Sequence, residues 1–242
     1  MIDDDIKNRR TALGWLVGGG IVAAASLAGD QTCAAEESVP LNKLPKAIKD
    51  AAERILPKGT WHTVVKVVDE KNIAYELDGS DGKDRDVTVM VTAQGKVVEV
   101  ETQLKKPANV PAKVLATVQA KWPKFTPTET HEIRQGKDLQ GLKDGDYVYD
   151  MRGTIAKGRD IQVQVTADGE ILESTVELPL DKVPAVVTAA LKKAKPNFEI
   201  EAAYAIREAD KLIGYHFEVK GPKGRDRTIS VTPDGTQVEI VE

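Results

Sequence analysis

The chain has 242 residues, a formal net charge of -4 from 34 basic and 38 acidic side chains, and an aromatic content of only 5%. The two charge signs are mixed along the chain, which argues against a nucleic-acid-binding protein, because such proteins concentrate basic residues in a stripe or patch. With Cys33 as its single cysteine, the chain has no disulfide framework or cysteine-based metal site, and apolar burial must stabilise the fold.

Residues 1–35 have the pattern of a secretory signal peptide. Lys7, Arg9 and Arg10 precede an apolar run over residues 13–28, and small residues follow up to Ala35. We expect cleavage after Ala35, export to the periplasm or the medium, and a linker over residues 36–42. Three alternatives remain open: an uncleaved membrane anchor, lipidation of Cys33, and twin-arginine export. For an anchor the apolar run of about 16 residues is short against the ~20 residues of a membrane span.

The rest of the chain repeats one double motif three times. Two prolines first bracket a helical pattern, at residues 45–57, 111–123 and 184–196. The pattern Lys-x-Arg-Asp-x4-Val-Thr-x-x-Gly then begins at Lys83, Lys157 and Lys223. Such recurrence indicates three copies of one small unit. We place the units at residues 43–104, 108–178 and 182–242.

The first unit begins with a helix and continues with four strands. Ile48, Ala51, Ala52 and Ile55 recur at helical spacing. Strands are expected at residues 61–68, 73–78, 87–91 and 97–102, because apolar and polar residues alternate in the central two. A short turn at Gly95 separates the last two strands.

The second and third units repeat this order. Helices between the proline pairs are followed by first strands at residues 128–134 and 199–207 and by last strands at 171–176 and 238–241. Asp-Gly turns at residues 168–169 and 234–235 are strong hairpin signals. We therefore predict an α+β fold of three tandem units, each a helix followed by a four-stranded antiparallel sheet that the helix covers on one face. The units are expected to share surfaces or to join their sheets edge to edge.

This order of helix, four strands and a Val-Thr-x-Asp-Gly turn before the last strand resembles the PepSY-like family. The tandem unit is also similar to that of secreted β-lactamase inhibitor proteins. The resemblance covers almost all of the chain after residue 35. It implies a secreted bacterial, non-catalytic protein-binding module, often proposed to inhibit peptidases, although no peptidase follows in this chain.

One loop is a candidate binding site. The segment between the first two strands of the second unit is longer than in the other units and spans residues 135–146. Long polar hairpin loops on a rigid sheet are frequent places for binding function. The candidate partner-binding residues are Lys137, Asp138, Leu139, Gln140, Leu142 and Lys143. The outer face of the sheet is the other candidate surface.

Other recurring residues are better explained by structure. The arginine of the Lys-x-Arg-Asp motif is expected to cap the sheet rim or bond helix-end carbonyls. Glu76, Asp150 and Glu218 recur on the second strand, where we expect solvated carboxylates. The three histidines lack zinc-ligand spacing. We expect no catalytic residues, no metal site and no cofactor.

The leading hypothesis is an exported, non-enzymatic protein that binds an extracytoplasmic protein or peptide, with inhibition of a secreted hydrolase as its sharper form. The second is a structural, envelope-associated repeat protein without a discrete ligand site. An enzyme is the third, and it would require a cleft with convergent polar groups.

Overall fold

The computed structural model describes residues 35–69, 72–83, 85–105, 109–135, 147–222 and 224–241. Within them lie three ten-residue helices, α2 (Lys46–Ile55), α3 (Ala112–Lys121) and α4 (Ala185–Ala194). Four strands follow each helix, and one more strand precedes α2. The strands are β1 (Ala35–Ser38), β2 (Thr60–Asp69), β3 (Asn72–Ser80), β4 (Asp86–Thr92), β5 (Val97–Gln103), β6 (Thr126–Gln135), β7 (Tyr147–Thr154), β8 (Asp160–Thr166), β9 (Ile171–Glu177), β10 (Glu199–Glu208), β11 (Lys211–Lys220), β12 (Asp226–Val231) and β13 (Val238–Ile240). The predicted α+β class is confirmed.

The helices begin and end where the proline pairs predict. Pro45, Pro111 and Pro184 each stand directly before the first helical residue. A proline in this place loses nothing by lacking an N–H, because the first amides of a helix have no intrahelical acceptor. The buried face of α2 consists of Ile48, Ala51 and Ala52, in agreement with the apolar periodicity.

All 13 strands form one antiparallel sheet in sequence order, from β1 to β13. The units join edge to edge, because β5 pairs with β6 and β9 pairs with β10. Of the two expected arrangements, shared surfaces or joined edges, the structure therefore has the second. Backbone hydrogen bonds thus run without interruption across the junctions between units.

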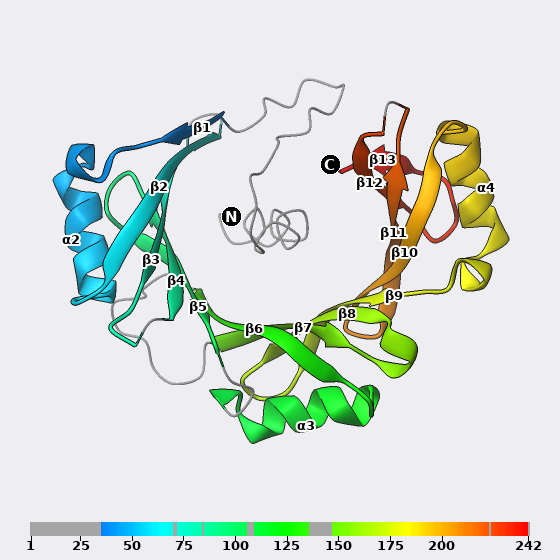
Figure 1. Ribbon diagram of the computed structural model, residues 1–242, viewed down its shortest axis with the longest axis horizontal. Coiled ribbons are helices and arrows are strands. Elements are labelled where there is room, and N and C mark those ends of the chain that lie inside the picture. The colour runs from blue at the N-terminus through cyan, green and yellow to red at the C-terminus, as the bar shows by residue number, and fades with distance from the viewer. Residues whose placement is uncertain are drawn as a thin grey trace.

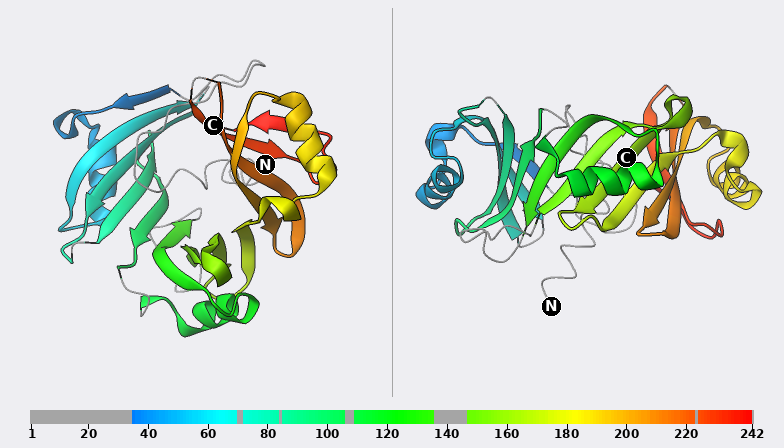
Figure 2. Two further views of the ribbon diagram at one scale, coloured as in Figure 1. Left: turned by 45° about the vertical axis from the view of Figure 1, so that its right-hand side comes forward. Right: turned by 90° about the horizontal axis from the view of Figure 1, so that it is seen from below.

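The sheet bends into an arc with the three helices on its convex side (Figure 1). The view from below shows the same arrangement, with each helix lying across the convex face (Figure 2). Three separate apolar clusters fill the spaces between the helices and the sheet, centred on Leu77, Met151 and Phe217. The alternate side chains of every strand therefore face the concave side.

A glycine in the left-handed conformation lies in the last turn of each unit, close to the helix of that unit. Gly95, Gly169 and Gly235 have φ values of 80°, 84° and 73°. A Cβ at Gly95 would also lie 2.8 Å from the carbonyl oxygen of Ala47 in α2. The turn needs glycine both for its backbone conformation and for this close approach.

The segment expected as a linker contains regular structure. Ala35–Ser38 form β1, which pairs with β2, and Leu41–Lys43 form a 3-10 turn, η1. Pattern analysis missed β1 because four residues with two adjacent glutamates show no apolar alternation. Of the expected signal peptide over residues 1–35, only Ala35 is among the described residues, as the first residue of β1. Of the candidate loop over residues 135–146, only Gln135 is described, as the last residue of β6.

Candidate functional site

The concave face of the sheet is the candidate functional surface. Directly opposed residues on antiparallel strands share a face, so the strand register identifies the side chains that point away from the helices. This face is rich in carboxylates from most of the strands: Glu76, Asp78, Asp86, Glu99, Glu101, Glu129, Asp150, Asp160, Glu173, Glu177, Glu208, Glu218, Asp226 and Glu239. Among the described residues, the cationic side chains that the register places there are Arg152, Lys211 and Lys220, and the imidazoles are His131 and His216. Burial lowers the pKa of His216 to about 4, so this imidazole is neutral at pH 7.

His131 lies at the centre of a charged cluster where β5 meets β6. Its Nδ1 is 2.6 Å from Oε1 of Glu101, and its Nε2 is 2.9 Å from Oε1 of Glu129. Burial alone would lower the pKa of His131, but the hydrogen bonds and charges of the two glutamates outweigh it and raise the pKa to about 9. The imidazole is therefore a cation at neutral pH, held between two carboxylates.

Glu129 binds further groups from the neighbouring strands. Its Oε1 also accepts a hydrogen bond of 3.4 Å from Gln103, and its Oε2 is 3.9 Å from Nη1 of Arg152. Burial would raise the pKa of Glu129, yet the hydrogen bond and charge of His131 hold it below its usual value. The cluster thus connects the last strand of the first unit with the first two strands of the second.

Asp150 corrects the expectation of a solvated carboxylate. Gln162 donates to both of its carboxylate oxygens, at 3.0 and 2.8 Å, and Gln164 donates to Oδ2 at 3.3 Å. Desolvation by these and other packed neighbours raises the pKa of Asp150, against the opposing effect of the hydrogen bonds and of Arg152. Gln162 and Gln164 lie on the neighbouring strand β8, so the pattern of β7 alone does not reveal that they cover this position.

Two further carboxylates on the concave face are also destabilised in their charged form. Burial and the negative charges of Asp150 and Glu208 raise the pKa of Glu173 to about 7. Burial likewise raises the pKa of Glu218, even though Tyr204 donates a hydrogen bond to it. At this end of the face neighbouring carboxylates act on one another, because Asp150 and Glu208 act on Glu173 and Glu177 acts on Glu218. Cationic groups of a bound partner would relieve the repulsion between these charges.

The arginines of the Lys-x-Arg-Asp motif have different contacts in the first two units. Nε of Arg85 is 2.7 Å from Oδ2 of Asp81, and Arg159 donates to the carbonyl oxygens of Ala156 and Glu177. Neither arginine bonds a helix-end carbonyl, so that expectation is wrong for both. The other expectation, that the arginine caps the rim of the sheet, agrees with the position of Arg159.

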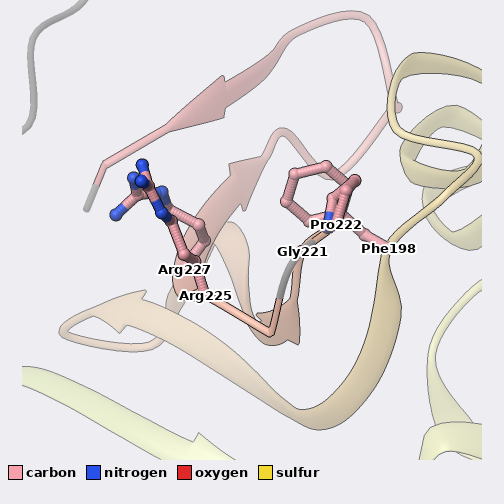
Figure 3. Close-up of a pocket in the computed structure, with 5 residues that line it drawn as sticks. All are labelled: Phe198, Gly221, Pro222, Arg225 and Arg227. Carbon is pink, nitrogen blue, oxygen red and sulfur yellow. The ribbon is translucent and has the colours of Figure 1, made fainter.

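In the third unit the motif borders a pocket of about 350 Å³. Figure 3 shows Arg225 and Arg227 pointing to the same side of the strand, while Phe198 and Pro222 lie together beside Gly221. The pocket lies on the helix side of the rim, because Arg227 is directly opposite the core residue Val219. It is therefore separate from the concave face.

The candidate loop residues Lys137, Asp138, Leu139, Gln140, Leu142 and Lys143 all lie outside the described residues. Sequence analysis named the sheet face only as a second candidate and did not identify His131 or Glu173. The sequence does contain a signal for this face, because a glutamate recurs at the equivalent position in the last strand of every unit. These residues are Glu99, Glu173 and Glu239, each directly before Val100, Ser174 or Ile240.

Across the described ranges, no group of three or more histidine, cysteine, aspartate and glutamate side chains is arranged to hold a metal ion. In the same part of the chain, no helix has the length and apolar character needed to cross a membrane.

Comparison with known proteins finds similar solved structures. No family model matches the chain, and no curated protein matches it. A DUF2874 family protein from Bacteroides uniformis aligns with a TM-score of 0.42 and 18% identity, over 55% of this chain and 89% of that one. A BLIP-like protein from Bacteroides fragilis aligns with a TM-score of 0.40 and 18% identity, over 53% and 84%. A protein from Bacteroides eggerthii that is provisionally named as periplasmic aligns with a TM-score of 0.42 and 16% identity, over 55% of this chain and 88% of that one. Similarity at this level carries no inference about what this chain binds.

Proposed function

We propose that this chain is an exported, non-catalytic binding protein that recognises a cationic surface of an extracytoplasmic protein through the concave face of its sheet. The observation that carries the proposal is the excess of carboxylates on that face, which no described helix covers. The curved sheet holds these groups on a rigid frame. A partner with lysine or arginine side chains would gain favourable contacts along several strands at once.

The distribution of charge over the molecule supports this proposal. Although the net charge is only -4, the convex helices carry exposed lysines, among them Lys46, Lys113 and Lys192. The concave face therefore carries far more carboxylates than cations, whereas the helices together carry both charge signs. Such an arrangement orients an approaching cationic partner toward the concave face and disfavours approach from the helices.

The sharper form of the proposal is inhibition of a secreted hydrolase. In this form the sheet face and the loop with Leu139 and Leu142 would contact the partner together, because hairpin loops on a rigid sheet are suited to recognition. Export rests on the leader pattern over residues 1–35, and the PepSY-like resemblance supports a binding role.

Affinity capture from envelope and secreted fractions tests the proposal. The bait is the chain from residue 36, compared with a triple variant in which Glu173, Glu177 and Glu208 become glutamine. The matched control removes the same charge elsewhere, with Glu53→Gln, Asp168→Asn and Glu170→Gln. These three residues are exposed and lie outside the concave face.

We expect one extracytoplasmic protein to be retained by the wild type and the control and to be lost with the concave-face variant. A parallel variant lacking residues 136–145 tests the loop. Equal capture by all variants would refute a role for the concave face, and capture of nothing specific would favour the structural, envelope-associated alternative.

A further inference from the structure

The edges between units repeat one pairing scheme. Leu104 N–H donates to the carbonyl oxygen of Thr130 at 2.7 Å, where β5 meets β6, and Leu178 N–H donates to that of Ala203 at 2.7 Å, where β9 meets β10. The last strand of one unit therefore always receives the first strand of the next in the same register.

β1 follows the same scheme at the beginning of the sheet. Val39 N–H donates to the carbonyl oxygen of Val64 at 2.9 Å, and Ser38 lies opposite Val65. Gln103 lies opposite His131 in the equivalent place at the next junction. β1 thus occupies on β2 the position that a preceding unit would fill, and it covers this edge.

The outer edge of β13 has no such cover in the described part of the chain, where β12 is its single neighbour. Val241 N–H donates to the carbonyl oxygen of Thr228 at 2.9 Å, so Val241 faces β12. Antiparallel strands alternate the direction of their backbone groups, and the N–H and C=O of Val238 and Ile240 therefore point outward. This edge is equivalent to the edges of β5 and β9 that bind a strand.

We propose that the outer edge of β13 binds an extended segment of a partner protein as an additional antiparallel strand, and that this segment carries an aliphatic residue followed by an arginine. Both internal junctions display this chemistry. The docking strands contain Ile133-Arg134 and Ile206-Arg207, and their arginines lie opposite Val100 and Ser174. Ile240 is the equivalent residue in β13.

The residue directly after β13 offers an exposed apolar side chain to the aliphatic residue of the partner segment. Ile133 lies opposite Glu101, and Ile206 lies opposite Thr175. Val241 occupies this position in the third unit and is 40% exposed. A partner's isoleucine or valine would cover it, which adds apolar burial to the backbone hydrogen bonds that a docked strand makes.

A second folded copy of this chain does not offer the required strand. β6 and β10, which carry the isoleucine–arginine pairs, each have two neighbours in their own sheet. The edge strands that a folded copy does offer, β1 with the sequence AEES and β13 with the sequence VEI, contain no aliphatic residue followed by an arginine. The occupant is therefore an extended segment of a different protein. This inference is independent of the concave-face proposal, because it depends on backbone groups at one edge and not on the carboxylates.

A synthetic peptide with the sequence of residues 129–137 serves as the probe, labelled for fluorescence polarisation with the full-length protein. We expect saturable binding that Ile240→Pro weakens by about tenfold, because proline removes the outward N–H of residue 240 and with it one backbone hydrogen bond to the peptide. Proline is tolerated on an edge strand where the N–H faces outward. An unchanged melting temperature serves as the control for folding.

Methylated peptides test the register without altering the protein. At the β5–β6 junction the backbone groups of Thr130 face β5, and by alternation so do those of Arg134. N-methylation at the Arg134 position should abolish binding, whereas N-methylation at the Ile133 position should leave it within about twofold. The concave-face variant should bind the peptide as the wild type does.

Absence of saturable binding would overturn the proposal, as would equal effects of the two methylations or insensitivity to Ile240→Pro. A concentration-dependent dimer of the protein alone that Ile240→Pro dissociates would also overturn it, because the edge would then bind a second copy.

Discussion

Replacing His131 with glutamine should remove a pH-dependent part of the stability of the fold. The imidazole side chain is 15% exposed and lies between Glu101, whose side chain is 6% exposed, and Glu129. A pKa that rises from 6.5 to about 9 on folding corresponds to about 3 kcal/mol of stability from the protonated form. Without the imidazolium, Glu101 is left as a buried carboxylate with no compensating charge.

The sign of the pH dependence follows from the direction of this shift. Because the folded state raises the pKa of His131, its contribution is fully present below the unfolded pKa of 6.5 and is lost as the pH rises through about 9. Urea unfolding of wild type and His131→Gln between ~pH 6 and ~pH 10 measures it. The difference in unfolding free energy between the two proteins should shrink by about 3 kcal/mol over this range.

Nuclear magnetic resonance titration of the His131 ring provides the direct check. An imidazole that titrates near its ordinary value would refute the reasoning, since Glu101 and Glu129 would then not stabilise its charged form. A constant difference in stability over the whole pH range would refute it as well.

Two further predictions concern the concave face and the strand ends. Glu173→Gln should stabilise the protein by about 1–2 kcal/mol above ~pH 7, after allowance for solvent screening, and by little near ~pH 4. The reason is the raised pKa of Glu173, because of which the wild type loses stability as the pH rises from 4.5 through about 7. Urea unfolding at both pH values measures the change. Gly153→Ala should cost about 1–3 kcal/mol, because its Cβ would lie 2.2 Å from the carbonyl oxygen of Thr126, whereas Gly82→Ala, with no atom within 4 Å, should be nearly neutral. Equal melting temperatures of the two alanine variants would contradict this.

Local patterns were sufficient to predict the order of the helices and strands after β1. The prolines determined the helix boundaries, and alternation placed β2 to β5 within one or two residues, as for β2, where residues 61–68 were expected and Thr60–Asp69 are observed. These signals depend on neighbours in the sequence, and the chemistry of turns and caps determines them.

The candidate site depends on contacts between strands, both within a unit and between units, and the pattern of a single strand does not contain them. The pattern of β7 alone predicts that Asp150 is solvated, yet Gln162 and Gln164 from β8 cover it. The pairing of Glu101 with His131 likewise requires that β5 and β6 join. Whether repeated units share surfaces or edges is decided by long-range pairing, so the charged concave face could not be derived before the sheet was known.

Carboxylate footprinting of the complex with a captured partner tests most directly whether the concave face binds. Carbodiimide-driven labelling followed by mass spectrometry measures the accessibility of each carboxylate in the free and bound protein. We expect Glu173, Glu177 and Glu208 to lose labelling in the complex, while Glu53 and Glu170 keep it. Protection of Glu53 and Glu170 with unchanged labelling of the concave face would contradict the proposed function.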